Sequence, residues 1–351
     1  MPDDGTYQGG RSDLLRADRL DTDETAAAVD RANRPLSLDG FTGQDPVKQQ
    51  LRVFLNAARQ RGECIDHTLL AGPPGLGKTT LAGIIAAEMQ GELTTASAPA
   101  IGRTGDMAAL LMAISAGGVL FIDEIHRLPK PSAEMLLSAM EDFAIDIMVG
   151  EGMSARTHRL DVPEFTLIGA TTRPGMLPGP LRDRFGIHLR LEFYDDAALA
   201  QVIARDAETM GISGDRDAFV RLAGRARGTP RIAKRMLRRT RDVMQDTGEP
   251  TLTPQVVDNA LDLLGVDSQG LDPLDRRYLS VITRNHRGGP VGVETIAAAL
   301  AEDRETLEVS VEPYLVARGF VDRTPRGRLV TPDGWRAAGY SPATSENGAL
   351  L

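Results

Sequence analysis

Two short stretches of the chain hold residue types whose spacing could bind a nucleoside triphosphate. The first, Gly72–Thr79, fits the pattern G-x-x-x-x-G-K-[ST], in which glycines let the backbone bend tightly so that amide groups point at phosphate oxygens. Lys78 is placed to reach the β- and γ-phosphates, and the Thr79 hydroxyl can ligate Mg²⁺. Residues 68–71 predict a short buried strand and the residues after Thr79 predict a helix, which is the context that this phosphate loop requires.

The second stretch supplies acidic side chains. Val119–Ile122 is a continuous apolar run, which is typical of a strand buried on both faces of a parallel sheet. Asp123 at the end of that strand can hold a magnesium ion, and Glu124 can orient and deprotonate an attacking water. Two adjacent acids at a strand end can also be a solvated turn, but binding sites in open parallel sheets lie at the carboxyl ends of strands. Together the two stretches predict a protein that binds a nucleoside triphosphate with Mg²⁺ and hydrolyses it.

Three further segments fit an ATPase that activates water, because such an enzyme needs a sensor of the γ-phosphate and positive charge for the transition state. Thr172 follows an apolar strand, so its hydroxyl can lie at the edge of the sheet. Arg182 and Arg184 follow a Pro-rich loop and are candidates for a finger that reaches a neighbouring subunit, and Arg231 opens a basic helix. Each segment also has a simpler interpretation, as a strand-end threonine, a surface ion pair or a helix cap.

Composition limits the class of protein. A chain of 351 residues with 42% apolar side chains is expected to hold two or three globular domains. It contains no apolar run long enough for a membrane span, and its polar, acidic N-terminus lacks the features of a signal peptide. The single cysteine, Cys64, cannot form an intrachain disulfide, so we expect a cytoplasmic protein.

Charge and histidine patterns are less decisive. The formal net charge of −9 argues weakly against indiscriminate nucleic-acid binding, although the distribution of charge matters more than its sum. Residues 221–241 are rich in Arg and Lys and contain no acid, so this segment either contacts DNA or forms a solvated or ion-paired face. The histidines, including His67 and His126, show no metal-ligand spacing and are expected to be satisfied polar groups.

The order of apolar runs predicts the domain organisation. The alternation of strand-like and helical segments in the first half predicts a parallel α/β sheet with helices on both faces. The expected strands are 68–71, 93–97, 119–122, 166–171 and 187–193, with a β-hairpin of 145–149 and 157–162 around 150–152. The expected parts are a disordered N-terminal arm (1–30, with a possible short helix at 24–32), a large ATPase domain (31–194), a small helical lid domain (195–265), a winged-helix DNA-binding domain (266–340) and a flexible tail (341–351).

The winged helix is predicted from the last third of the chain. Helical segments at 274–283, 293–301 and 304–318 precede two short extended runs. Pro325 and Gly327 mark the turn between these runs, so three helices are followed by a hairpin.

In this order and combination the motifs resemble those of the AAA+ ATPases and, more narrowly, those of the RuvB family of Holliday-junction branch-migration motors. The resemblance extends over about residues 15–340. Its most specific parts are the Gly-Glu-Gly hairpin at 150–152 and the arginine-rich wing at 323–328. The fold that it implies is an AAA+ P-loop domain followed by a helical lid and a winged helix.

The resemblance implies a role for each residue that matches a family motif. It places at ATP the residues Arg34, Gly75, Gly77, Lys78, Thr79, Thr80, Glu141, Asp142, Phe143, Tyr194 and Arg231, with Mg²⁺ on Thr79 and Asp123. The catalytic residues that it implies are Asp123, Glu124, Thr172 as first sensor and Arg184 as finger in trans. It favours Arg184 over Arg182, between which spacing alone does not choose, and it places Arg323, Arg326 and Arg328 at the DNA backbone.

The resemblance also implies partners. They are the duplex DNA of Holliday junctions, identical subunits in a hexameric ring, the junction-binding protein RuvA and the resolvase RuvC. In the family the hairpin docks on a partner through apolar side chains, whereas here His158 occupies one such place and Leu160 the next. The alternative is an exposed hairpin without a partner.

We therefore expect an ATP-driven ring motor that moves duplex DNA during recombination and repair. Another AAA+ replication ATPase, of the clamp-loader or initiator type, is an alternative against which the wing at 323–328 counts. A winged-helix DNA-binding protein that uses ATP only as a switch is another, and the presence of both Asp123 and Glu124 counts against it. A DExH-type helicase would share residues 123–126 but needs further motifs that the chain lacks.

Overall fold

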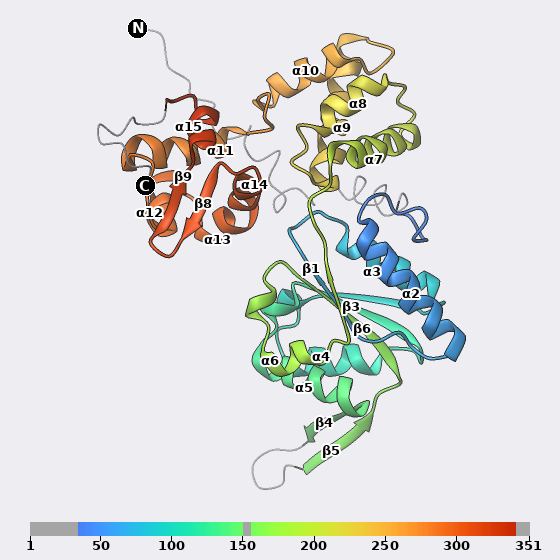
Figure 1. Cartoon of the computed structure of the whole chain (residues 1–351). Coiled ribbons are helices and arrows are strands. Elements are labelled where there is room, and N and C mark those ends of the chain that lie inside the picture. The colour runs from blue at the N-terminus through green and yellow to red at the C-terminus, as the bar shows by residue number, and fades with distance from the viewer. Residues whose placement is uncertain (1–33, 150–155, 342–351) are drawn as a thin grey trace. The chain divides into compact units, whose positions relative to one another are not determined.

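The computed structural model describes residues 34–149 and 156–341 (Figure 1). One compact unit extends to Glu192 and a second begins at Phe193, so the two are described separately. The expectations for the N-terminal arm with its helix, for the Gly-Glu-Gly tip and for the tail beyond Ser341 fall outside the described residues. In the ranges that are described, no helix is both long and apolar enough to cross a membrane.

The first unit is built on a five-stranded parallel sheet. Its strands are β1 (Thr68–Ala71), β2 (Leu93–Ser97), β3 (Gly118–Asp123), β6 (Phe165–Thr171) and β7 (Ile187–Arg190), in the order β2-β3-β6-β1-β7. All residues of β6 are buried, as are all but the last of β3, because helices cover both faces. The predicted strands are confirmed, and only the last is shorter than expected, since β7 ends at Arg190 rather than at residue 193.

Helices lie on both faces of this sheet. Figure 1 shows α2 (Asp45–Arg61) and α3 (Lys78–Glu88) on one face and α4 (Thr104–Met112), α5 (Lys130–Asp142) and α6 (Gly179–Asp183) on the other. Short 3₁₀ turns cover Ala98–Ala100, Ile125–Arg127 and Pro174–Met176. The core between the sheet and the second set of helices includes Leu111, Leu136 and Leu181, which follow the apolar spacing of those helices.

The predicted hairpin is present between α5 and β6. Its arms are β4 (Ala144–Val149) and β5 (Arg156–Asp161), which pair antiparallel with Ile145 opposite Leu160 and Ile147 opposite His158. The bases of the two arms rest on the core of the unit, where Ile145 is buried.

The second unit begins with an all-helical part, as predicted. Its helices are α7 (Asp196–Thr209), α8 (Arg216–Ala223), α9 (Pro230–Thr247) and α10 (Pro254–Leu263). The side chains of Asp195, Thr229 and Thr253 cap three of these helices by accepting a backbone N–H of the first turn. These caps fix where each helix starts and therefore where α9 presents its first residues.

The last part of the chain folds as the predicted winged helix. It contains α11 (Pro273–Ser280) with a π-helical extension Val281–Asn285, α12 (Val293–Leu300), and α13 (Arg304–Thr306) continued through a π-helical segment Leu307–Val311 into α14 (Glu312–Ala317). The wing consists of β8 (Val321–Thr324) and β9 (Gly327–Val330), followed by α15 (Pro332–Ala337). Helix α15 was not predicted from the sequence, although Thr331 followed by Pro332 is a helix-start signal and Trp335 packs on the core of the winged helix.

A buried ionic cluster joins the helical part to the winged helix. Arg227 is 5% exposed, and its Nη2 lies 2.8 Å from Asp272 and 2.6 Å from Asp275. Its Nε donates to the carbonyl oxygen of Gly270, and its guanidinium stacks over the ring of Tyr314. Burial raises the pKa of Asp275 to about 8 against the opposing effect of Arg227, and the neighbouring Asp272 carboxylate adds to the rise.

Candidate nucleotide site and DNA-binding wing

The phosphate loop connects the end of β1 to the start of α3. Gly77 caps α3 with a left-handed φ of 101°, and a side chain at Gly72 would lie 2.6 Å from the carbonyl oxygen of Leu191, so the loop needs glycine at both positions. Lys78 is buried, and its ammonium donates to the carbonyl oxygens of Gly72 and Pro73 over 2.8 and 3.0 Å. The cationic head of Lys78 therefore lies against the loop itself.

Helix α3 starts at Lys78, so the half-buried Thr79 and Thr80 belong to its first turn. The first N–H groups of a helix have no partner inside the helix, and they carry the positive end of its dipole. A phosphate group at this end of α3 would be bound by these amides, in the loop formed by Gly75 and Gly77.

Three strand ends bring the other candidate residues to the same edge of the sheet. β6 lies between β3 and β1, with Ala71 paired to Thr171 and Ile122 paired to Gly169. The residues that follow these pairs are Asp123, Glu124 and Thr172, and the loop that starts at Gly72 follows the same edge. The structure thus brings the phosphate loop, both acids and the sensor threonine together, as the sequence predicted.

Glu124 has an unusual backbone and a well-defined carboxylate. Its φ of 49° and ψ of 44° lie in the left-handed region, which costs a residue with a side chain of order 1–3 kcal/mol. Its Oε2 accepts a hydrogen bond from the Thr172 hydroxyl at 3.1 Å and a longer one from the Thr172 amide at 3.4 Å. Nδ1 of His126 lies 3.2 Å from the same oxygen. Glu124, the candidate catalytic acid, and Thr172, the candidate sensor, are therefore in direct contact.

The ligand atoms present fit a magnesium ion bound together with a nucleotide. In the described ranges there is no group of three or more His, Cys, Asp or Glu that could hold a metal. The Thr79 hydroxyl and the Asp123 carboxylate are oxygen ligands, and Mg²⁺ usually takes one or two protein ligands and completes its shell with phosphate oxygens and water. Such an ion, when bound, would neutralise charge on the β- and γ-phosphates.

Arg184 lies at the end of α6 and contacts the end of α5. Its Nε is 2.9 Å from Oε1 of Glu141, and both side chains are 44% exposed. Asp142 pairs instead with Arg159 of the hairpin at 3.2 Å, and Phe143 packs edge-on against Phe165 of the core. The three residues Glu141–Phe143 thus have three different contacts.

Three residues that the resemblance places over the nucleotide belong to different units. Arg34 is exposed in the first unit, whereas Tyr194 and Arg231 lie in the second. Tyr194 is buried and its amide donates to the carbonyl oxygen of Gly228, while Arg231 is exposed in the first turn of α9. Their role at the nucleotide stays a prediction.

The hairpin residues differ in exposure. His158 is exposed, but Leu160 is half-buried and packs on the core cluster of the first unit. Met148, on the opposite arm, is 74% exposed. The exposed side chains that a docking surface could use are therefore His158 on one face of the hairpin and Met148 on the other, because His158 pairs with Ile147 and Met148 pairs with Thr157.

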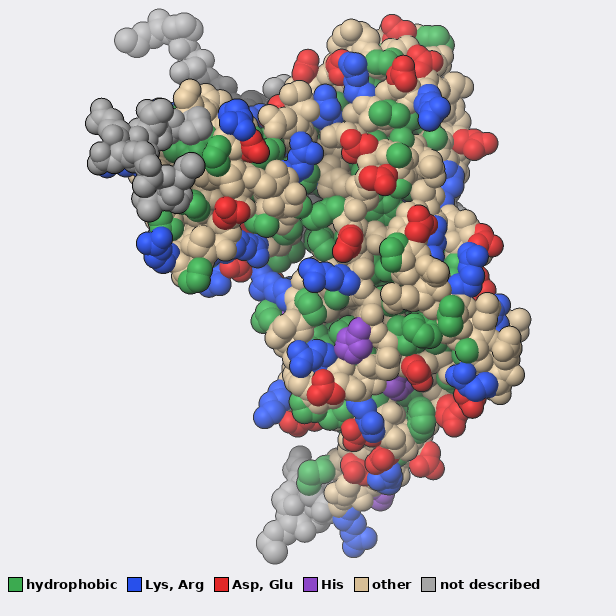
Figure 2. Space-filling view, viewed as in Figure 1, with side chains coloured by type: hydrophobic (Ala, Val, Ile, Leu, Met, Phe, Trp, Pro, Cys, Tyr) green, Lys and Arg blue, Asp and Glu red, His purple; other side chains and the backbone are tan. Residues whose placement is uncertain are grey.

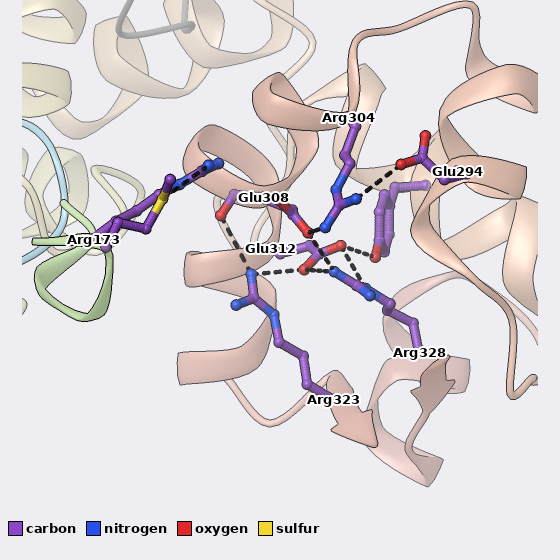
Figure 3. A network of polar contacts seen from close by, with 9 residues as sticks. Arg173, Glu294, Arg304, Glu308, Glu312, Arg323 and Arg328 are labelled. Atoms are coloured by element: carbon purple, nitrogen blue, oxygen red, sulfur yellow. Dashed lines mark hydrogen bonds and ion pairs between the residues drawn. The ribbon is translucent and has the colours of Figure 1, made fainter. Parts of the chain in front are cut away.

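The wing contains a dense ionic network around a buried carboxylate (Figure 3). Glu312 is fully buried, and Arg328 donates to both of its oxygens, with Nε to Oε1 at 2.9 Å and Nη2 to Oε2 at 3.1 Å. Arg323 lies 2.6 Å from Oε2, and the Tyr278 hydroxyl donates to Oε1 at 2.9 Å. Burial and the Glu312 carboxylate raise the pKa of Tyr278, so its hydroxyl stays protonated and can donate.

The three wing arginines therefore differ. Arg328 is 16% exposed and also pairs with Glu308, and Arg323 is half-exposed at 47%. Arg326 lies in the turn of the wing, is exposed, and makes no ion pair or hydrogen bond with any residue that the structure describes. It is the wing arginine whose charge is least compensated.

The basic segment 221–241 is largely paired with acids in its own unit. Its ion pairs include Arg221 with Asp258, Lys234 with Asp206 at 3.0 Å, and Arg239 with Asp242 at 3.0 Å. On the face shown in Figure 2, Lys and Arg side chains alternate with Asp and Glu. These contacts favour the ion-paired interpretation of the segment over a DNA-binding one.

Two residues of the site were not singled out from the sequence. His126 was expected to be an ordinary satisfied histidine, and it lies against the candidate catalytic acid. Glu312 gave no signal, because its partners Tyr278, Arg323 and Arg328 are distant in the chain or on another element. The position of His126 two residues after Glu124 was the only available indication.

Comparisons with known proteins agree with this geometry. Family models match three consecutive parts of the chain: the P-loop domain of the Holliday junction DNA helicase RuvB at residues 33–191, the RuvB AAA lid domain at 194–267 and the RuvB C-terminal winged-helix domain at 268–338. Among solved structures, a Thermotoga maritima RuvB described as a Holliday junction branch migration motor is 46% identical with a TM-score of 0.81. A lysine-to-arginine variant of that protein is 47% identical with a TM-score of 0.82. Each match covers 88% of this chain and 99% of the other.

Proposed function

The chain belongs to the RuvB family of Holliday-junction branch-migration motors, and on that basis we propose that it hydrolyses ATP with Mg²⁺ in a hexameric ring of identical subunits. The energy released moves duplex DNA through the ring and drives branch migration of a four-way junction. Its partners are junction DNA, a junction-binding protein of the RuvA type and a resolvase of the RuvC type. Its proposed place of action is the cytoplasm, a reducing compartment in which its single cysteine would stay a free thiol.

One observation carries the proposal: a phosphate loop, two acids and a sensor threonine meet at the carboxyl edge of one parallel sheet. In this arrangement Lys78 and the first turn of α3 bind the phosphates. Asp123 and Thr79 hold the metal ion. Glu124 accepts a proton from the attacking water. Thr172 hydrogen-bonds Glu124 and lies at the edge of the sheet where the γ-phosphate would bind.

The proposal of a ring is supported by the position of Arg184. Within its own chain Arg184 contacts Glu141 at the ends of α6 and α5, and it is half-exposed. A guanidinium that enters a neighbouring active site stabilises the charge of the phosphoryl-transfer transition state and is worth about 10³–10⁵ in rate. A subunit without a neighbour would then bind ATP and hydrolyse it slowly.

The DNA contact is proposed on the winged helix, with the wing arginines at the phosphate backbone. Such contacts carry no sequence information, which suits a motor that must move along any duplex. The test is ATPase activity of the purified chain with and without four-way junction DNA and the junction-binding partner, with particle size measured in the same samples. A chain that turns over at full rate as a monomer, with no response to DNA, would contradict the ring motor.

A further inference from the structure

His126 lies next to the catalytic acid but has no role in the mechanism above. Its side chain is 4% exposed, and its Nδ1 lies 3.2 Å from Oε2 of Glu124. The same nitrogen lies 2.9 Å from the hydroxyl of Thr171, which is fully buried. The imidazole thus connects the end of β3 to the end of β6.

All contacts of the Glu124 carboxylate end on one oxygen. In the part of the chain that the structure describes, the Thr172 hydroxyl, the Thr172 amide and Nδ1 of His126 all contact Oε2. Oε1 is left to accept a proton, and the side chain is 29% exposed toward solvent. Anchoring Oε2 from two sides therefore sets the direction in which Oε1 points.

The chemistry of the contact defines the tautomer. An ionised carboxylate can only accept hydrogen bonds, so Nδ1 must carry a proton when it faces Glu124. The Thr171 oxygen already accepts the amide N–H of Arg173 at 3.0 Å, and its second lone pair can share the Nδ1 proton. Thr171 thereby holds the imidazole in the orientation that serves Glu124.

From these contacts we propose that His126 is a positioning residue for ATP hydrolysis. It donates its Nδ1 proton to Oε2 of Glu124 and thereby directs Oε1 to the attacking water. No proton leaves the imidazole in this role. The inference rests on the proposed ATPase function, because it assigns a partner to the base of that reaction.

The test compares four variants at one position in the full-length chain, with DNA and partner present. His126→Asn keeps a donor close to the place of Nδ1, whereas His126→Gln moves the donor to the place of Nε2 and His126→Leu has none. Loss of a hydrogen bond to a charged group predicts a kcat about 10- to 100-fold lower for His126→Leu and His126→Gln. His126→Asn should retain most of the rate, and His126→Ala should match His126→Leu.

Binding of a fluorescent ATP analogue separates positioning from damage to the fold, since its Kd should stay within about twofold in all four variants. His188→Asn, a change at an exposed histidine of β7, is the matched control and should leave kcat unchanged. A rank order in which Gln or Leu equals or exceeds Asn, or a variant faster than the parent chain, would overturn the proposal. The proposed function is tested independently by Glu124→Gln, which should abolish turnover whatever the histidine variants do.

Discussion

Arg184 and Glu141, two residues assigned to nucleotide chemistry for separate reasons, form an ion pair of 2.9 Å between the ends of α6 and α5. The pair uses Nε of the guanidinium, and the two terminal nitrogens make no ion pair or hydrogen bond among the described residues. The stem of Arg184 is therefore oriented while its terminal nitrogens stay available. This is the geometry expected of a finger that is prepared by its own subunit and used by the next.

Arg184→Ala should retain nucleotide binding and lose turnover by about 10³-fold or more, because transition-state charge is left without its cation. Lys78→Ala should weaken nucleotide binding as well. Arg182→Ala is the matched control and should cost little, since the one ion pair that this side chain forms among the described residues is with the adjacent Asp183. Steady-state ATPase rates and nucleotide titrations measure both quantities.

Mixing two inactive variants tests action in trans. Arg184→Ala chains supply an intact Glu124 and Glu124→Gln chains supply an intact Arg184, so mixed rings contain some complete sites. Activity should appear on mixing and be highest near equal amounts. If the mixture stays as inactive as its components while rings still form, the arginine works within its own subunit.

Substitutions of the wing arginines should affect DNA affinity and protein stability separately. Arg326→Ala should leave the melting temperature unchanged and lower the slope of log affinity against log salt by about 0.9, the value for one lost phosphate contact. Arg328→Ala should lower the free energy of unfolding by about 1.5–3 kcal/mol, because the buried Glu312 loses a two-pronged partner. Thermal melts and DNA titrations at several salt concentrations distinguish the two, and equal melting curves would contradict the network.

The hairpin should be tested at Met148 rather than at Leu160. Met148→Ser changes a side chain that is 74% exposed, so it should spare basal ATP hydrolysis and reduce stimulation by the junction-binding partner. Leu160→Asp would place a charge against the core cluster and is expected to lower stability as well. Stimulation that survives Met148→Ser together with His158→Ser would remove the docking surface from this hairpin.

The cluster of Arg227, Asp272 and Asp275 predicts a dependence of stability on pH. The pKa of Asp275 is raised to about 8 in the fold, above its ordinary value near 4, so the folded state binds a proton that the unfolded chain releases. Its contribution to stability is full below pH 4 and is lost as the pH rises to about 8. Asp275→Asn should flatten this part of the stability profile, as measured by denaturation at several pH values.

The positions of the strands could be predicted from their apolar residues and from the residue types that end β1, β3 and β6, although β2 and β7 are not continuously apolar. The order of the strands in the sheet was not predicted. The candidate acids and a strand-end threonine could be placed at the sheet edge because they end or follow apolar runs, and the choice of Thr172 as sensor came from the family resemblance. The contact between Glu124 and Thr172 joins residues 48 positions apart, and it depends on β6 lying beside β3. Such a pairing is set by tertiary packing, which no local pattern contains.

For several residues named from the sequence, burial and pairing with distant partners could not be predicted. Leu160 fits an exposed docking residue by its place in the hairpin, yet it packs on the core cluster and is half-buried. Arg323 and Arg328 have the same residue type and nearly the same place as Arg326, yet a buried Glu312 takes up their charge. Burial and pairing, rather than residue type, decide which arginine is available for the proposed DNA contact.

The last turn of α5 makes two ion pairs, one with the hairpin and one with the candidate finger Arg184. Asp142 holds Arg159 of the hairpin, and the preceding Glu141 holds Arg184. A partner protein that displaces the hairpin would therefore also displace the end of α5 that orients Arg184. Binding of a partner at the hairpin and ATP hydrolysis in the neighbouring subunit would then be mechanically coupled through two adjacent acids, Glu141 and Asp142.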